Sequence, residues 1–83
     1  MITRMWEVRA EPAGFDALVE WVRHTGVPAV AARPGFRGSE VYRSEDHRLV
    51  VISHWDTESA DLPEPPEGLA ARPPHAWDFT RIG

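Results

Sequence analysis

The sequence predicts an α+β fold in which one amphipathic helix lies on a four-stranded antiparallel sheet. Three observations support this. Residues 48–55 form a nearly continuous apolar run that ends in Trp55, as is typical of a central strand. Residues 15–22 carry apolar side chains at helical spacing. Three prolines within residues 63–66 prevent a second long helix later in the chain.

Size and composition limit how the chain can be stabilised. We expect its 83 residues to form a single domain, residues 1–83. A chain this short buries only about 60 to 65% of the surface that its unfolded form exposes. It has no cysteine for disulfides or thiolate metal sites, which fits a reducing cytoplasm, so we expect a cytoplasmic protein stabilised by association.

Charge and composition together exclude several classes of function. The net charge is -4 and the acidic residues are scattered, which argues against a nucleic-acid partner. The sequence has no apolar run long enough to span a membrane, so no membrane role is expected. All nine basic residues are arginine, and the chain has no Lys, Asn or Gln. A Schiff-base lysine and a carboxamide oxyanion donor are therefore excluded.

The first half of the chain predicts a strand followed by two helical segments. In residues 2–9, alternate side chains, including Trp6 and Val8, share one face. A helix then opens at Pro12, with Gly26 as its expected end. A short helical segment over residues 27–32 is closed by Pro34 and Gly35.

The second half predicts a hairpin, an irregular crossover and a last strand. Residues 36–43 and 48–55 are the strands of the hairpin, joined by a polar turn. The last strand covers residues 75–82, with Trp77, Phe79 and Arg81 on one face.

This order of elements is the split βαβ plan of a ferredoxin-like domain whose second helix is shortened or lost. Right-handed crossovers place both connections on one face of the sheet and leave the other face bare. On residues 48–55 the bare face carries either Val50, Ile52 and His54 or the alternate set that includes Trp55. Both sets are largely apolar, so we expect a homodimer formed sheet against sheet.

These features resemble the antibiotic biosynthesis monooxygenase-like (ABM) domains of the dimeric α/β-barrel superfamily. The likeness covers residues 1–58 and resumes at His75, and its most specific parts are the turn at residues 34–38 and Trp55 followed by Asp56 and Thr57. The resemblance implies a homodimeric barrel with a cavity between sheet and helices. Members include cofactor-independent monooxygenases of anthrone-like or quinol substrates, haem-degrading enzymes and cyclases. Trp55 matches a strand-end tryptophan that lines the cavity in several members.

The sequence also departs from that family. The ligand-orienting asparagine of its haem-degrading and anthrone-oxidising members has no counterpart, since the chain contains no asparagine. The haem-ligating histidine of the haem-degrading branch lies on the second long helix, and residues 62–67 replace that helix with a proline-rich segment. The resemblance therefore does not extend to haem degradation, and no cofactor is expected.

Four histidines are the first candidates for chemistry, but no two have the spacing of metal ligands, so no metal site is predicted. His54 and Asp56 lie two apart and could form an oriented general base, or His54 could lie in a dimer interface while Asp56 caps a turn. Ser53 and His54 point to opposite faces of a strand, which excludes a hydrolytic triad.

The remaining constellation is aromatic and cationic. Its members are Trp6, Trp21, Tyr42, Trp55, Trp77, Phe79, Arg4 and Arg81. A planar phenolic ligand would suit a pocket walled by Trp55, Trp21 and Trp77 with Arg81 as the partner of its anion, although core packing also explains aromatic residues. His54 or Tyr42 would then take the proton, with His75 as a further candidate.

Two functions remain open. The first is cofactor-independent oxygenation or cyclisation of an aromatic, polyketide-like molecule by a small homodimer of secondary metabolism. The second is a non-catalytic dimer that binds a small molecule or a partner enzyme. A closed pocket of a few hundred Å³ beside Trp55 would favour the first, and solid packing there would favour the second.

Overall fold

Four antiparallel strands form one sheet in the computed structural model, which describes residues 1–83. Their order is β2-β3-β1-β4, the predicted split βαβ arrangement, so the α+β fold class is confirmed. The last strand is shorter than predicted, because it ends at Phe79 instead of residue 82. The strands are β1 (Ile2–Arg9), β2 (Phe36–Arg43), β3 (Arg48–Trp55) and β4 (His75–Phe79).

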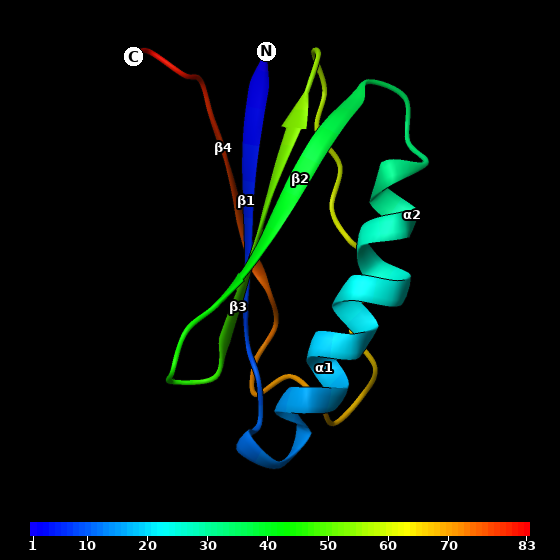
Figure 1. Ribbon diagram of the computed structural model, residues 1–83, viewed down its shortest axis with the longest axis vertical. Helices are drawn as coiled ribbons and strands as arrows, with labels where there is room; N and C mark the ends of the chain where they lie inside the picture. Colours follow the sequence, from blue (N-terminus) through cyan, green and yellow to red (C-terminus); the bar gives the residue numbers. More distant parts are fainter.

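A continuous helical rod follows β1 and covers one face of the sheet (Figure 1). Its consecutive parts are η1 (Pro12–Gly14), α1 (Phe15–Trp21), η2 (Val22–Gly26) and α2 (Val27–Ala31). The prediction that Gly26 ends the first helix is wrong, since the backbone stays helical through this residue.

A proline two residues after η2 explains the wide helical turn that includes Gly26. The η2 turn is π-helical, with the Val27 N–H donating to the Val22 carbonyl. Pro28 has no N–H to donate, and its ring would crowd the carbonyl four residues earlier, so a wider turn carries the rod past it. Gly26 itself is needed for packing, because a Cβ there would lie 2.8 Å from Cδ2 of Leu62.

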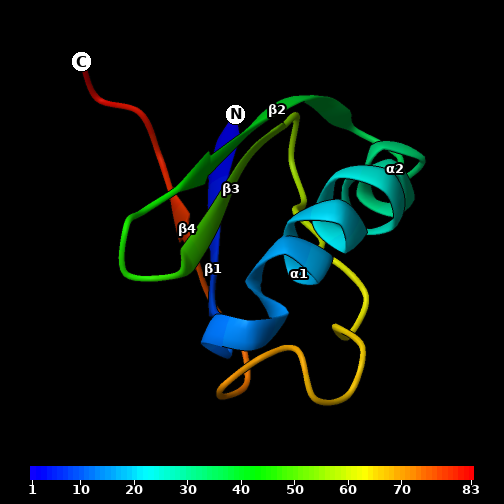
Figure 2. The ribbon, with the colours of Figure 1, turned by 60° about the horizontal axis from the view of Figure 1, so that its bottom comes forward.

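The segment between β3 and β4, called the crossover here, takes the place of a second helix. Residues 56–74 contain no helix, which confirms the predicted loss. The crossover runs past the rod on the same side of the sheet and returns to β4 (Figure 2). Leu62 from the crossover enters the core between the rod and the sheet. The buried core residues are Trp6, Val8, Ala10, Leu18, Val22, Val30, Leu49, Val51, Trp55 and Leu62.

The other face of the sheet, called the open face here, has nothing packed on it. Of the two alternatives for β3, this face carries Val50, Ile52 and His54, because Trp55 is buried on the helix side. Cross-strand pairing arranges its side chains in three rows. From β4 to β2 the rows are Phe79, Thr3, His54 and Gly38; Trp77, Met5, Ile52 and Glu40; and His75, Glu7, Val50 and Tyr42.

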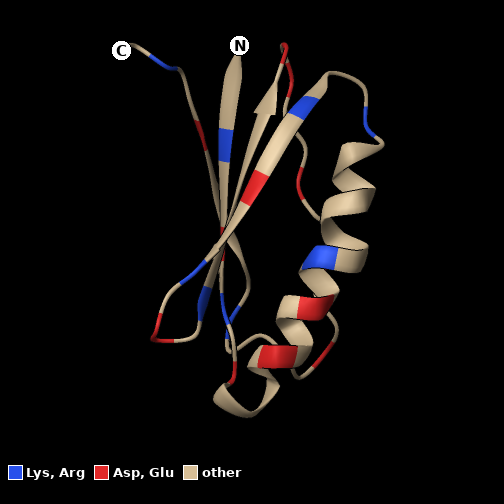
Figure 3. Ribbon diagram, in the orientation of Figure 1, with Lys and Arg blue, Asp and Glu red and all other residues tan.

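Charged residues of both signs are interspersed over the molecule (Figure 3). No helix has the length and apolar character needed to cross a membrane. Large aromatic side chains are exposed on the open face, where Tyr42, Trp77 and Phe79 are 55%, 47% and 50% exposed.

Candidate functional site

The end of β3 fixes Trp55 inside the molecule. Its side chain is fully buried, and its indole Nε1 donates a hydrogen bond of 2.8 Å to Oγ of Ser53. Phe36 packs edge-on against the indole at a centroid distance of 5.4 Å. The next residue is tied down as well, because the Asp56 N–H donates to the carbonyl of Gly35, whose φ of +83° suits glycine. This tryptophan thus has its polar atom satisfied within its own strand.

The pocket beside Trp55 is small. Its volume is about 140 Å³, below the roughly 300 Å³ at which small-molecule sites usually begin. The tryptophan contributes one wall, and the start of the crossover contributes another. The lining residues are Arg33, Pro34, Trp55, Glu58, Ser59 and Ala60.

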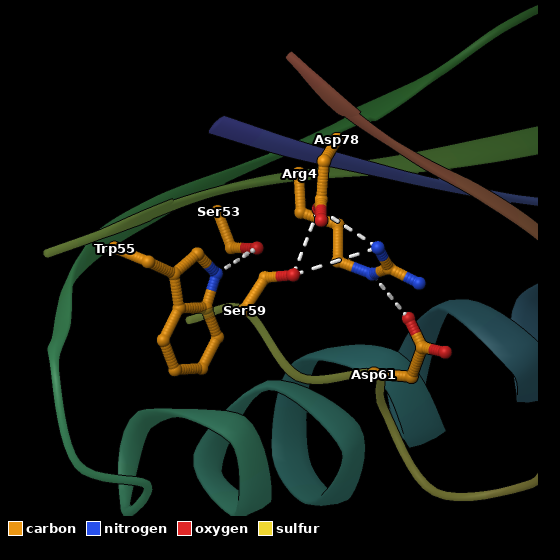
Figure 4. A network of polar contacts seen from close by, with 6 residues as sticks. All are labelled: Arg4, Ser53, Trp55, Ser59, Asp61 and Asp78. Carbon is orange, nitrogen blue, oxygen red and sulfur yellow. Dashed lines mark hydrogen bonds and ion pairs between the residues drawn. The ribbon is translucent and has the colours of Figure 1, made fainter. Parts of the chain in front are cut away.

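An arginine on the helix side of β1 pins the crossover to the sheet (Figure 4). Arg4 Nε donates to Asp61 at 2.5 Å, and its Nη1 donates to Asp78 at 2.8 Å. Ser59 Oγ also donates to Asp78, at 2.8 Å. The hydrogen bond from Arg4, followed by that from Ser59, holds the pKa of Asp78 below its usual value, while hydrogen bonding to Asp61 raises the pKa of Arg4.

A second pocket, of about 270 Å³, lies next to this network and has a largely polar lining. The lining residues are Arg4, Trp6, Asp61, Leu62, Pro63, Glu64, Pro74 and Ala76.

The Arg4 network was not predicted from the sequence. The available signal was a charged residue at a core-facing position of β1, which requires a partner when it is partly buried.

The candidate base, His54, lies on the open face and has a carboxylate partner. Its Nε2 lies 2.9 Å from Oε1 of Glu40, and its Nδ1 lies 3.4 Å from the hydroxyl of Thr3. Of the two alternatives for His54, the pairing with Asp56 is wrong, since Asp56 forms an ion pair of 3.2 Å with Arg37 instead. Asp56 follows the end of β3, whereas Glu40 is held on the neighbouring strand by the pairing of β2 with β3.

Two more predicted residues share this face. Trp77 stacks on His75, with ring centroids 6.0 Å apart, in the β4 part of the open face. Tyr42 stands opposite Val50, four residues from His54, which is about 14 Å along the strand at ~3.4 Å per residue. One proton of a bound molecule therefore cannot contact both Tyr42 and His54.

The remaining predicted residues lie elsewhere. Trp21 packs against the core on the helix side, as Trp55 does, and close to Gly26. Arg81 lies beyond β4, is exposed, and donates from Nε to the carbonyl of Gly83. The structure thus brings His54 and Trp77 onto the open face with Tyr42, separates them from Trp55 and Trp21 by the thickness of the sheet, and leaves Arg81 outside both groups.

Comparison with solved structures supports the fold. An 18% identical match with a TM-score of 0.70 is the monooxygenase from the gene ActVA-Orf6 of Streptomyces coelicolor, in complex with the ligand nanaomycin D, and it covers 99% of this chain and 88% of that one. A protein of Bordetella bronchiseptica, provisionally assigned as an antibiotic biosynthesis monooxygenase, matches at 21% identity with a TM-score of 0.67, covering 98% of this chain and 96% of that one.

The sequence comparisons agree with the structural ones. A search of curated proteins found no match. The family model described as "Antibiotic biosynthesis monooxygenase" matches residues 1–62, which is most of the chain and ends at the crossover residue that enters the core. With the strand order and the strand-end tryptophan in place, this match shows that the chain belongs to the antibiotic biosynthesis monooxygenase (ABM) family.

Proposed function

We propose that this protein is a homodimer of secondary metabolism that binds an aromatic, polyketide-like molecule and oxygenates or cyclises it without a cofactor. Membership of the ABM family supports the reaction class. The likeness to a monooxygenase in complex with nanaomycin D supports the ligand class. The single observation that carries the assignment to this chain is the His54–Glu40 pair, which lies on the same face as exposed aromatic residues.

The open face of the sheet supports the proposed homodimer. Met5, Val50 and Ile52 form a partly buried apolar centre, and Trp77 and Phe79 extend it to the β4 edge. Each Å² of such surface removed from water contributes about 25 cal/mol. A second copy packed sheet against sheet would cover this area and would place His54 between the two sheets, away from bulk water.

His54 has the hydrogen bonds that a general base needs. When Nε2–H donates to Glu40, Nδ1 carries the lone pair and receives only the long contact from Thr3. A substrate C–H or O–H placed at Nδ1 can lose its proton there, and the Glu40 carboxylate stabilises the imidazolium that forms. For oxygenation, the substrate carbanion then reduces dioxygen, so that a CH₂ group and O₂ give a carbonyl group and water. Cyclisation needs only the deprotonation and the enclosed space.

A second candidate function is a non-catalytic dimer that binds a ligand or a partner enzyme. The packing around Trp55 favours it, because this side chain is fully buried and its pocket holds only about 140 Å³. A tricyclic ligand would not fit there without movement of the crossover. Both candidates share the homodimer. They differ in turnover, and the second also allows a partner enzyme as the bound molecule.

Oxygen uptake with anthrone as the probe tests the proposal. We expect the wild-type protein to accelerate uptake and His54→Ala to lower the rate by roughly 10²- to 10⁴-fold, the usual contribution of a general base. The control is His24→Ala, which removes an exposed imidazole on the helical rod and should leave the rate unchanged.

Three outcomes decide between the candidates. Full activity of both His54→Ala and Tyr42→Phe would exclude the proposed bases. Anthrone binding without any acceleration by the wild-type protein would support the non-catalytic dimer. Absence of both binding and turnover would contradict the ligand class itself.

A further inference from the structure

A groove lies between the helical rod and β2, at the hairpin end of the sheet. Its volume is about 330 Å³, within the range of small-molecule sites. The floor is apolar, with Leu49 almost fully buried and Val41 partly exposed. The lining residues are Val19, Arg23, Val41, Tyr42, Arg43 and Leu49.

Two arginines flank this apolar floor from opposite sides. Arg23 comes from the helical rod and Arg43 from the end of β2. Neither forms an ion pair, whereas Arg4, Arg37 and Arg48 each pair with an aspartate. No acidic residue lines the groove, so its two guanidinium groups are free to bind an anion.

The local backbone contributes to this arrangement. Arg23 lies in the π-helical turn η2, which the rod adopts ahead of Pro28. Such turns change the direction in which side chains leave a helix, and they recur at functional sites. A neighbouring hollow of about 460 Å³ shares Arg43 and is lined also by Phe15, Ser44, Glu45 and His47. Its one carboxylate, Glu45, lies in the hairpin turn, beyond the apolar floor.

We propose that this groove is a second binding site, which takes an aromatic or aliphatic monocarboxylate. The apolar body would lie on Val41 and Leu49, and the carboxylate would be held between Arg23 and Arg43. The floor of the groove lies on the helix side of the sheet, since Val41 and Leu49 are both on the face opposite His54. Dimerisation through the open face therefore leaves it accessible, and the proposal does not depend on the chemistry at His54.

Calorimetric titration with 2-naphthoate and with the neutral 2-naphthamide tests the site. The two probes have nearly the same shape, so a difference in Kd reports the anion. We expect the wild-type protein to bind naphthoate at least about tenfold more tightly than the amide, the difference typical of charge-assisted hydrogen bonds. Arg23→Gln and Arg43→Gln should each weaken naphthoate binding about tenfold, and the double variant should bind both probes equally weakly.

The matched control is Arg72→Gln, which removes the same charge from an exposed position in the crossover. It should leave both Kd values unchanged, and circular dichroism should show the same fold for all variants. Equal Kd values for the two probes in the wild-type protein would overturn the proposal. So would the absence of naphthoate binding, or an undiminished preference for naphthoate in the double variant.

Discussion

The Trp55 side chain is held by a hydrogen bond within its own strand. The apolar run in the sequence predicts that Trp55 ends a strand, and Trp55 is the last residue of β3. However, the indole N–H is satisfied by Ser53 two positions earlier on the same strand, so the whole side chain can be buried. A strand pattern places both residues on one face but does not report a hydrogen bond between them.

Ser53→Ala should lower the free energy of unfolding by about 1–3 kcal/mol, because it leaves the buried N–H of Trp55 without an acceptor. In a Trp55→Phe background there is no N–H to satisfy, and the same serine change should cost much less. Urea unfolding of the four proteins in this cycle measures the coupling. Equal effects of Ser53→Ala in both backgrounds would mean that the hydrogen bond contributes nothing.

Among the elements, the crossover most distinguishes this chain from the full ferredoxin-like plan. Its prolines remove the second helix, and the segment is instead held by Leu62 in the core and by the Arg4 network. The loss of the helix was predictable from the prolines. The network was not, because Arg4 meets Asp78 only through the register of β1 on β4 and meets Asp61 only through the path of the crossover.

The Arg4 network makes stability depend on acid. The pKa of Asp78 is lowered in the folded state, so its contribution is complete above the ordinary aspartate value of about 3.9 and is lost as the pH falls below it. Thermal unfolding from about pH 6 to about pH 2.5, which spans the ordinary aspartate pKa, should therefore show a smaller acid-induced drop in Tm for Asp78→Asn than for the wild-type protein. The control is Asp16→Asn, which removes an exposed carboxylate that has no ion-pair partner. An equal drop in Tm for wild type and Asp78→Asn would contradict this account.

Much of the secondary structure could be predicted, for local reasons. The strands and the Pro34–Gly35 turn follow from alternation and from turn-forming residues. Gly26 misled the prediction because its role is tertiary, as the close approach of Leu62 shows. The partner of His54 was missed for the same reason, since Glu40 reaches it only through the register of β2 on β3.

The whole molecule has one face covered by the rod and the crossover and one face without a cover. This asymmetry separates the predicted site residues into two groups, because His54 and Trp55 are neighbours in sequence but lie on opposite faces. A proposed base on the open face is useful only if something encloses it. The proposed chemistry therefore depends on a second copy of the chain.

Sedimentation equilibrium at micromolar concentration measures whether the second copy is bound. We expect a species of twice the 9.4 kDa subunit mass for the wild-type protein. Trp77→Glu, which places a charge on the open face, should shift it toward the single subunit, while Ala17→Glu on the exposed side of α1 should not. A wild-type protein that remains a well-folded species of 9.4 kDa would contradict the dimer and the role assigned to His54 within it.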